Sequence, residues 1–576
     1  MRPFLTAIRP GAAVLVLLAA LPSAHAQVRP DAGSTLGTTR DAPATPRATP
    51  PVLPTFEPKP AIPGNTALMV KVGGFRLAGN TVYADAVLLD LLTEYIGRDL
   101  DLKGLYEAAD KIRSYYRGNG YFLAQAYLPV QELPKGQSAT VEITIIEGRI
   151  GKVTPKVAPD SRFRESFIKG ILDAGMHEGD LITETGLERP LLLLNDLAGA
   201  AVQSTIKPSA HVGAADLDVD VTRTPMFTGS VDFDNHGNRF TGEYRLGATV
   251  NVNNISGFGD QLTMRGQMTD QHSTSQYRVG YTLPVWHYGT KVGINYANVR
   301  YGLGKTEFAA LQATGHAQVS NFVVLHPFIR SRNLNVIGQA NYEVKALQDT
   351  TNSTNRVEDR NVKAGRYGVI GDFRDRVFGG GLNSFAAVYT AGVLNIQNDT
   401  LRNTDQTPGT GANTAGGFHK LNLDYQRLQY IAENLNLLYS ISIQHSFKNL
   451  TSAEKISLGG PAAVRAYPVS EALGDRGFYS TIEARYALPG FKLMQGDVAL
   501  SAFYDWGHVK TNHANPSIFT LASVRNLAGA GFGASLGKAE NFLIRASLAW
   551  RVEREKAVSD GADRNPRLWL QALKWF

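Results

Sequence analysis

The sequence predicts two small α/β units followed by a transmembrane antiparallel β-barrel of about 16 strands. Three observations support this fold class: a short apolar leader, two consecutive copies of one helix-and-strand pattern, and a long tail in which apolar and polar side chains alternate. The chain has 576 residues, of which 43% are hydrophobic and 19% are charged, so it can form packed cores.

Composition and motifs argue against several kinds of site. The chain has no cysteine, which removes disulfides, thiol catalysis and cysteine-bound zinc. The net charge of +7 is modest and no basic cluster accompanies it, so we expect no nucleic-acid partner. The 12 histidines lack metal-ligand spacing, and Gly533–Lys538 lacks the four-residue gap of a phosphate loop. We therefore expect no metal site, no cofactor and no enzymatic activity.

Residues 1–26 have the pattern of a secretory signal peptide. Arg2 and Arg9 supply positive charge ahead of an apolar core at Ala12–Leu21. Small residues at Ala24–Ala26 then mark a cleavage site. The alternative is a membrane anchor, but the apolar run is far shorter than the ~20 residues that a spanning helix needs.

Residues 27–66 are interpreted as an N-terminal segment and a proline-rich linker. Eight prolines fall between Pro43 and Pro63, which favours an extended, solvated spacer. The segment ahead of them, Arg29–Ala42, is rich in glycine and threonine and does not favour a helix.

The first α/β unit is expected at residues 67–148. Apolar residues recur every three or four positions from Leu102 to Tyr116, which indicates a helix that Gly118–Gly120 would end. The expected elements are a strand at 69–77, helices at 86–96 and 102–116, and strands at 121–128 and 139–146.

Residues 149–224 repeat this order and are expected to form the second unit. Pro190 is expected to interrupt its second helix early. The expected elements are a strand at 150–157, helices at 163–172 and 187–197, and strands at 200–206 and 217–221.

Residues 225–576 are expected to form the barrel. In its strand-length segments, apolar residues alternate with charged, amide or hydroxyl residues or glycine. This alternation fits a wall between lipid and water. The clearest segments are Tyr244–Val252, Gln261–Thr269, Leu435–Ile443, Val498–Trp506 and Phe542–Trp550. A soluble sandwich would also alternate, but rarely over such a length behind a signal peptide. At about 22 residues for each strand and its turn, the tail holds about 16 strands.

Short motifs make the two units similar to POTRA domains, the periplasmic modules of outer-membrane assembly and secretion proteins. The first unit opens with Phe75-x-Leu77-x-Gly79-Asn80-Thr81 and closes on Glu147-Gly148. The resemblance implies a structural motif made of Phe75, Gly79, Asn80, Gly120, Tyr121, Asn195 and Asp196. Residues 67–148 would then be POTRA 1 and residues 149–224 POTRA 2, with two generic α/β domains as the alternative.

A second set of motifs lies in the tail. Val464-Arg465-Ala466-Tyr467 precedes Phe503-x-Asp505-x-Gly507 on a later strand. Both resemble the two-partner secretion transporters of the outer membrane (TpsB type, the haemolysin and filamentous-haemagglutinin secretion family). In that family the sixth extracellular loop folds back into the barrel and carries a VRGY-type tip. The in-folded loop would span about 454–477 here.

Alternation in the strand supports a contact between these two motifs. Phe503, Asp505 and Gly507 share the lumen face, where a carboxylate is costly unless an arginine pairs with it. The expected lock between loop tip and barrel consists of Val464, Arg465, Tyr467, Phe503, Asp505 and Gly507. Alternatively, Arg465 and Asp505 are unrelated solvated charges. Ala466 replaces the family's glycine, which would cost ~1 kcal/mol or more if the position needs a positive φ.

The resemblance implies a function and a location. The chain would be a monomeric translocator in the outer-membrane lipid of a Gram-negative bacterium, with its POTRA domains in the periplasm. These domains would recognise an unfolded exoprotein of adhesin, haemagglutinin or haemolysin type, which the barrel would secrete. Related transporters plug the pore with an N-terminal helix, which Arg29–Ala42 does not favour. The alternatives are a POTRA-bearing barrel that assembles proteins into the outer membrane and a passive porin.

Overall fold

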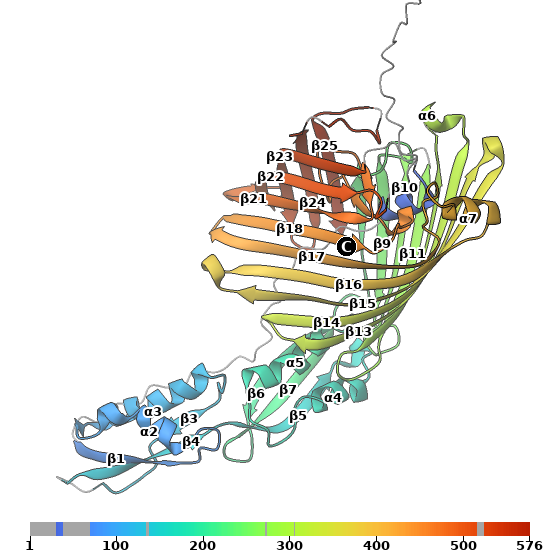
Figure 1. Ribbon diagram of the computed structural model, residues 1–576. Helices are drawn as coiled ribbons and strands as arrows, with labels where there is room; N and C mark the ends of the chain where they lie inside the picture. The colour runs from blue at the N-terminus through green and yellow to red at the C-terminus, as the bar shows by residue number, and fades with distance from the viewer. Residues whose placement is uncertain are drawn as a thin grey trace, which may run out of the picture.

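The computed structural model describes most of the chain. The described ranges are 30–38, 69–133, 137–270, 273–304, 306–514, 523–553, 555–560 and 562–576. The expected signal peptide at 1–26 and the prolines from Pro43 to Pro63 lie outside them. The described residues form two α/β units and a closed barrel, with the second unit at one rim of the barrel and the first unit farther away (Figure 1).

The first unit is a four-stranded sheet in the order β2-β1-β4-β3 that packs against helix α3. Its elements are β1 (Val70–Ala78), α2 (Asp85–Asp90), η1 (Thr93–Tyr95), β2 (Asp99–Leu100), α3 (Leu102–Gly118), β3 (Gln125–Tyr127) and β4 (Ala139–Ile146). Leu105, Ile112 and Tyr116 are buried on the sheet side of α3 because apolar residues recur on one face of the helix. Asp101 caps this helix by accepting a hydrogen bond from the Gly104 N–H (2.7 Å).

Two expected elements of the first unit were wrong in extent. The apolar run at 86–96 forms a short helix and a 3-10 turn instead of one helix. The cause is that the backbone at Gly97 and Arg98 bonds to Val72 of β1, which requires the chain to turn beforehand. The strand expected at 121–128 shortens to β3, because the chain makes a turn after α3 before it pairs with β4.

The second unit has a three-stranded sheet in the order β5-β7-β6. Its elements are β5 (Arg149–Val157), η2 (Pro159–Ser161), α4 (Glu165–Asp173), α5 (Glu184–Asn195), β6 (Ala200–Pro208) and β7 (Ala214–Arg223). The expectation that Pro190 interrupts the second helix was wrong, because α5 continues through it. Leu187, Leu191 and Leu194 are buried along α5, and their burial offsets the ~3 kcal/mol that an internal proline costs.

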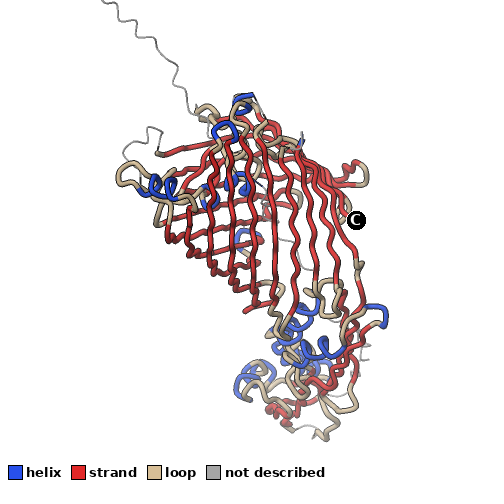
Figure 2. Tube along the Cα trace, turned by 90° about the vertical axis from the view of Figure 1, so that its right-hand side faces the viewer, coloured by secondary structure: helices blue, strands red, loops and turns tan. Residues whose placement is uncertain are grey.

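The tail forms a closed antiparallel barrel of 16 strands, which confirms the predicted fold class (Figure 2). The strands are β8 (Phe227–Asp234), β9 (Arg245–Asn253), β10 (Gln261–Thr269), β11 (Thr274–Pro284), β12 (Lys291–Gly302), β13 (Ala313–Arg330), β14 (Leu334–Thr351), β15 (Arg356–Asp375), β16 (Gly381–Ile396), β17 (Gly416–Ala432), β18 (Leu435–Ser446), β21 (Arg476–Leu493), β22 (Gly496–Lys510), β23 (Val524–Lys538), β24 (Phe542–Arg551) and β25 (Arg567–Trp575). Strand β25 pairs with β8 and closes the cylinder. Among the described residues, no helix has both the length and the apolar character that crossing a membrane requires.

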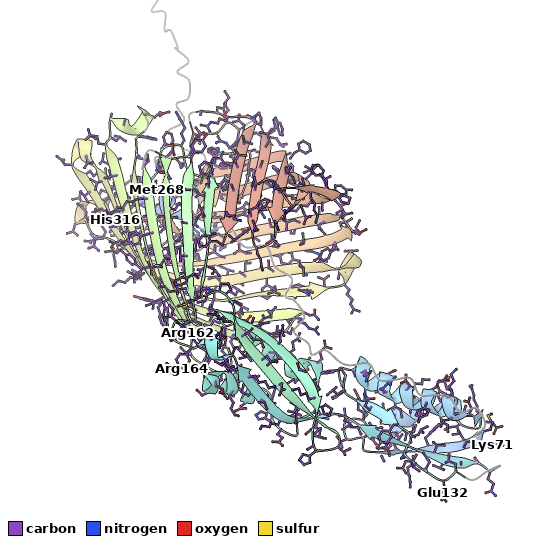
Figure 3. All side chains as sticks on the ribbon, turned by 180° about the vertical axis from the view of Figure 1, so that it is seen from behind. Lys71, Glu132, Arg162, Arg164, Met268 and His316 are labelled. Atoms are coloured by element: carbon purple, nitrogen blue, oxygen red, sulfur yellow. The ribbon has the colours of Figure 1, made fainter. Side chains whose placement is uncertain are left out.

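Three short turns of the barrel hold the second unit at its rim. Arg162 and Arg164, labelled in Figure 3, lie at this junction, on the second-unit side. The Arg164 guanidinium lies 4.3 Å from the centre of the Phe258 ring in the β9–β10 turn, and its backbone N–H bonds to the Gly257 carbonyl. The junction therefore fixes the second unit through several contacts. The exact residue boundaries of the two α/β units and the barrel remain predictions.

Helix α1 (Ala32–Thr38), blue in Figure 1, lies against the inner wall of the barrel. The expectation that this segment does not favour a helix was therefore wrong. Asp31 and Ser34 cap the helix reciprocally, the Ser34 N–H donating to Asp31 Oδ1 (2.7 Å) and the Asp31 N–H to Ser34 Oγ (3.0 Å). Ala32 and Leu36 supply the buried face and belong to one apolar cluster with Phe240, Tyr301, Leu347 and Ala453. Tertiary contacts thus stabilise a helix too short to be stable alone.

Candidate functional site

The chain between β18 and β21, residues 447–475, folds into the barrel and is called loop 6 below. Its strands β19 (Ile456–Leu458) and β20 (Ala472–Gly474) pair with each other inside the barrel. An apolar cluster attaches the loop to strands β22, β23 and β24, and its buried members are Ile456, Leu458, Val464, Ala466, Tyr467, Ala472, Phe503, Val509, Leu527 and Ala549. Loop 6 therefore fills part of the lumen with a packed core instead of lying free.

Arg465 and Asp505 face each other at the tip of this loop. The Arg465 guanidinium donates from Nε to Asp505 Oδ2 and from Nη2 to Asp505 Oδ1, each at 2.8 Å, and its backbone N–H adds a third bond (3.1 Å). Its Nη1 donates to Glu483 on β21 (2.7 Å). Asp505 also accepts from the Thr481 hydroxyl (2.9 Å). The Asp505 side chain is fully buried, so its charge is compensated by Arg465 rather than by water. This bidentate pair is therefore strong only while loop 6 stays in place.

The other expected lock residues surround this ion pair. The Arg465 guanidinium carbon lies 3.3 Å from the centre of the Phe503 ring. Tyr467 donates its hydroxyl to the Glu555 carbonyl (3.1 Å), and its backbone N–H bonds to the Val464 carbonyl in the turn of the tip. A Cβ at Gly507 would lie only 2.9 Å from Leu458, so glycine lets loop 6 approach β22.

Ala466 does not carry the backbone strain that its departure from the family pattern suggested. Its φ is not positive, so alanine is unstrained at this position. A Cβ placed at Gly529 of β23 would lie only 2.5 Å from the Cβ of Ala466. Ala466 therefore packs directly against the barrel wall.

Sequence reasoning missed three residues that hold loop 6. Trp569 of β25 donates its indole N–H to the Arg465 carbonyl (2.7 Å). Glu471 accepts from the backbone N–H groups of Val558 and Ser559 in the β24–β25 loop (2.8 and 3.0 Å). Glu454 is buried among lysines of the wall. Their partners lie from 34 to 109 positions away in the sequence, so no local pattern could have shown these contacts.

Helix α1 touches loop 6 as well as the wall. The Ser452 hydroxyl of loop 6 donates to Asp31 Oδ2 (2.6 Å), and the Ala32 N–H donates to Asp349 of β14 (2.8 Å). Tyr301 of β12 also donates to Asp349 (2.6 Å). Two separate segments of the chain therefore occupy the lumen and contact each other there.

In the first α/β unit, the turn after β1 is held by Glu147 at the end of β4. Glu147 accepts from the Thr81 and Val82 N–H groups (2.6 and 2.7 Å) and from the Tyr116 hydroxyl (2.9 Å). Gly79 has a φ of +88°, and a Cβ there would lie 2.3 Å from a β4 carbonyl. Asn80 donates to the Tyr83 carbonyl (2.9 Å) and so closes the same turn.

The electrostatics of this turn keep Glu147 ionised. Burial alone would raise the pKa of Glu147, but hydrogen bonds from Thr81 and Val82 outweigh it and place that pKa below its ordinary value. Burial, together with the Glu147 carboxylate, raises the pKa of Tyr116. Glu147 therefore acts as a charged anchor at neutral pH.

The remaining expected POTRA residues are structural in position. Phe75 is buried in the core, Gly120 ends α3 with a positive φ, and Tyr121 packs edge-on against Tyr83 and Tyr116. In the second unit, Asn195 accepts from the Val202 N–H (3.2 Å).

Asp196 joins the second unit to the barrel. It forms a bidentate pair with Arg330 at the end of β13, at 2.7 and 2.8 Å. Its backbone carbonyl accepts from the Lys291 ammonium group of β12 (2.7 Å). Glu188 of α5 pairs with Arg332 in the next turn (2.7 Å). The end of α5 is thus fixed to two adjacent hairpins of the barrel.

No group of three or more potential metal ligands occurs within the ranges that the structure describes.

Family comparisons match two parts of the chain. Residues 213–536 match the family described as haemolysin secretion/activation protein ShlB/FhaC/HecB, and residues 70–148 match the ShlB-type POTRA domain. The first match covers more than half of the chain, including loop 6 and Asp505.

Individual proteins agree with the family match. The heme/hemopexin transporter protein HuxB of Haemophilus influenzae is 27% identical over 492 residues, covering 85% of this chain and 84% of HuxB. The outer membrane transporter CdiB of Dickeya dadantii is 22% identical over 444 residues, 75% of each chain. The solved structure of CdiB from Escherichia coli shares the fold, with a TM-score of 0.65 and 20% identity over 91% of this chain and 94% of that one. This chain therefore belongs to the ShlB/FhaC/HecB family, the outer-membrane transporters of two-partner secretion.

Proposed function

We propose that this transporter exports one unfolded exoprotein of adhesin, haemagglutinin or haemolysin type through its barrel, as a monomer and without a catalytic step of its own. The buried pair between Arg465 and Asp505 carries the proposal, because it attaches a removable loop to the wall of the lumen. The names of the relatives HuxB and CdiB support a transported client.

Loop 6 and α1 have to leave their places before a polypeptide can pass. The tip is held by charge-assisted hydrogen bonds and not by a covalent link, so a client segment that competes for Asp505 can release it. An extended chain then moves through the lumen. Because the periplasm supplies no ATP, folding of the client outside the cell makes the passage one-way.

The POTRA domains would recognise the client by adding one of its segments as a strand. On POTRA 1 the short edge strand β3 is followed by Gln131, whose amide bonds to both the N–H and the carbonyl of Glu142 on β4 (2.8 and 2.9 Å). That side chain occupies the edge where a client strand would bind. On POTRA 2 the outer strands are β5 and β6, each nine residues long, and the backbone of Ile150 in β5 already bonds to Gly179 and Asp180. We therefore place client addition at β6.

Two substitutions test the proposed lock in secreting cells. Arg465→Ala and Asp505→Ala should damage secretion of the client, because each leaves the buried partner charge uncompensated, while the barrel still reaches the outer membrane. Arg356→Ala, which removes an exposed arginine of β15, is the matched control and should secrete normally. Normal export by both lock variants would refute this role of the ion pair.

A reversible cross-link tests whether loop 6 must move. Leu458 and Gly507 are in contact, and the chain has no other cysteine, so Leu458→Cys with Gly507→Cys offers one disulfide. The smaller side chain at 458 leaves room for the new one at 507. Oxidation of the double variant should stop export and reduction should restore it. Export by each single variant should be the same with and without the oxidant. Export through the oxidised double variant would mean that this part of the loop stays in place.

A further inference from the structure

A second ionic cluster holds the first part of loop 6 against strands β14, β15 and β17. Glu454 lies within 2.8 Å of the Lys420 ammonium group on β17, and Lys345 of β14 pairs with its other oxygen (2.5 Å). Arg366 of β15 is 3.5 Å away. The Glu454 side chain has no exposed surface and that of Lys345 has 1%. A carboxylate of the loop is therefore fully enclosed by cations of the wall.

The backbone of Glu454 is bound at the same place. Its carbonyl accepts from the Lys420 ammonium group (2.7 Å) and from the Gln444 amide (3.0 Å). The wall thus recognises both the carboxylate and the peptide group of this residue.

The charges of the wall do not balance without the loop. Lys345, Arg366 and Lys420 face Glu343, which pairs with Lys345 (3.0 Å) and Arg366 (2.9 Å). With Glu454 present, three cations meet two carboxylates. When loop 6 leaves, three cations meet one, and the uncompensated positive charge faces the lumen.

We propose that Lys345, Arg366 and Lys420 form a carboxylate-binding site in the lumen, occupied by Glu454 at rest and by acidic side chains of the passing client during export. The inference rests on the proposed release of loop 6. Glu454 itself identifies the ligand chemistry, because the site already binds a carboxylate together with an adjacent peptide carbonyl. Departure of Arg465 leaves Asp505 of β22 without its cation, whereas Glu483 of β21 keeps its ion pair with Arg485 (2.8 Å).

The test uses the purified full chain in planar lipid bilayers, with poly-glutamate and poly-lysine of equal length as probes. Glu454→Gln removes the resident carboxylate, so the variant should conduct more often than the wild type. The concentration of poly-glutamate that blocks the open pore should be about tenfold lower for this variant than for the wild type. Adding Lys345→Gln and Lys420→Gln should raise the blocking concentration of poly-glutamate at least fivefold and leave that of poly-lysine unchanged.

Two further variants keep the test decisive. Glu343→Gln retains all three cations and should strengthen the poly-glutamate block. If Glu454→Gln alone does not open, the Glu454→Gln chain in which residues 455–473 are also replaced by a short glycine linker supplies the open pore, with the same lysine substitutions. If the two lysine substitutions leave the blocking concentration of poly-glutamate unchanged, the proposal is wrong. This holds even if cells with the wild-type chain export the client normally. Conversely, a lysine-dependent block in a chain that exports no client would leave the site intact and remove the proposed function.

Discussion

Trp569 holds the carbonyl oxygen of Arg465 with its indole N–H at 2.7 Å, while Asp505 holds the guanidinium of the same residue. Trp569 belongs to β25, which closes the barrel against β8, and Asp505 belongs to β22. The loop tip thus spans two separated parts of the wall. Loss of either contact weakens the docked state of loop 6 without removing the other.

Trp569→Phe should loosen the tip while keeping an aromatic ring beside His236. The variant loses one hydrogen bond and leaves a buried carbonyl without its donor, which costs about 1–3 kcal/mol. Because 1.4 kcal/mol is a factor of ten, the open probability in planar bilayers should rise about tenfold. Trp550→Phe on the exposed outer face of β24 is the matched control. Equal open probabilities for wild type and Trp569→Phe would show that the indole bond contributes nothing to docking.

Arg465→Lys should separate charge from geometry at the tip. Lysine keeps the positive charge but cannot bond Asp505 bidentately and Glu483 at the same time. Arg465→Ala breaks a buried pair, at about 3–5 kcal/mol, so hydrogen exchange of loop 6 amides should accelerate at least about a hundredfold. Exchange in the lysine variant should lie between wild type and alanine. Wild-type exchange in both variants would contradict the assigned contact.

The barrel could be predicted from the sequence because strand alternation is local. Segments such as Gln261–Thr269 show a period of two that needs no knowledge of neighbours, and this range coincides with β10. The same alternation placed Asp505 on the lumen face. The motif that contains Arg465 then predicted an arginine partner for Asp505. In the structure, Arg465 Nε lies 2.8 Å from Asp505 Oδ2.

Features that depend on distant partners could not be predicted in this way. Helix α1 is stable because Ala32 and Leu36 pack against the barrel, although the reciprocal cap of Asp31 and Ser34 was a local signal that could have indicated it. The partners of Glu454 lie on three separate strands of the wall. No spacing in the sequence relates them to this residue, since barrel closure alone brings them together.

Asp196→Asn should free the second α/β unit from the barrel rim. The amide keeps the shape of the side chain but loses the charged bidentate pair with Arg330, at a cost of about 1.5–3 kcal/mol. Spin labels on Val212→Cys and Met494→Cys, both exposed, report the distance between domain and barrel in a chain without native cysteine. The distance distribution should broaden in Asp196→Asn.

The control for this measurement is Asp173→Asn, which removes an exposed ion pair with Lys169 on α4. It should leave the distribution as in the wild type. An unchanged distribution in Asp196→Asn would mean that the remaining contacts of the junction, such as Glu188 with Arg332, fix the domain without it.

Glu147→Gln should remove a pH-dependent part of POTRA 1 stability. Because the folded pKa of Glu147 lies below its ordinary value, its contribution is complete above the unfolded pKa of about 4.3 and is lost as pH falls through the folded pKa. Hydrogen exchange at the Thr81 and Val82 amides, corrected for the intrinsic rate, should therefore be slower in wild type than in the variant at pH 7. The difference should shrink as the solution is acidified below pH 4. Glu142→Gln, at an exposed pair with Arg76 on the same strand, is the control. A difference between wild type and Glu147→Gln that stays constant from pH 7 to pH 3 would show that the carboxylate holds the turn by shape and not by charge.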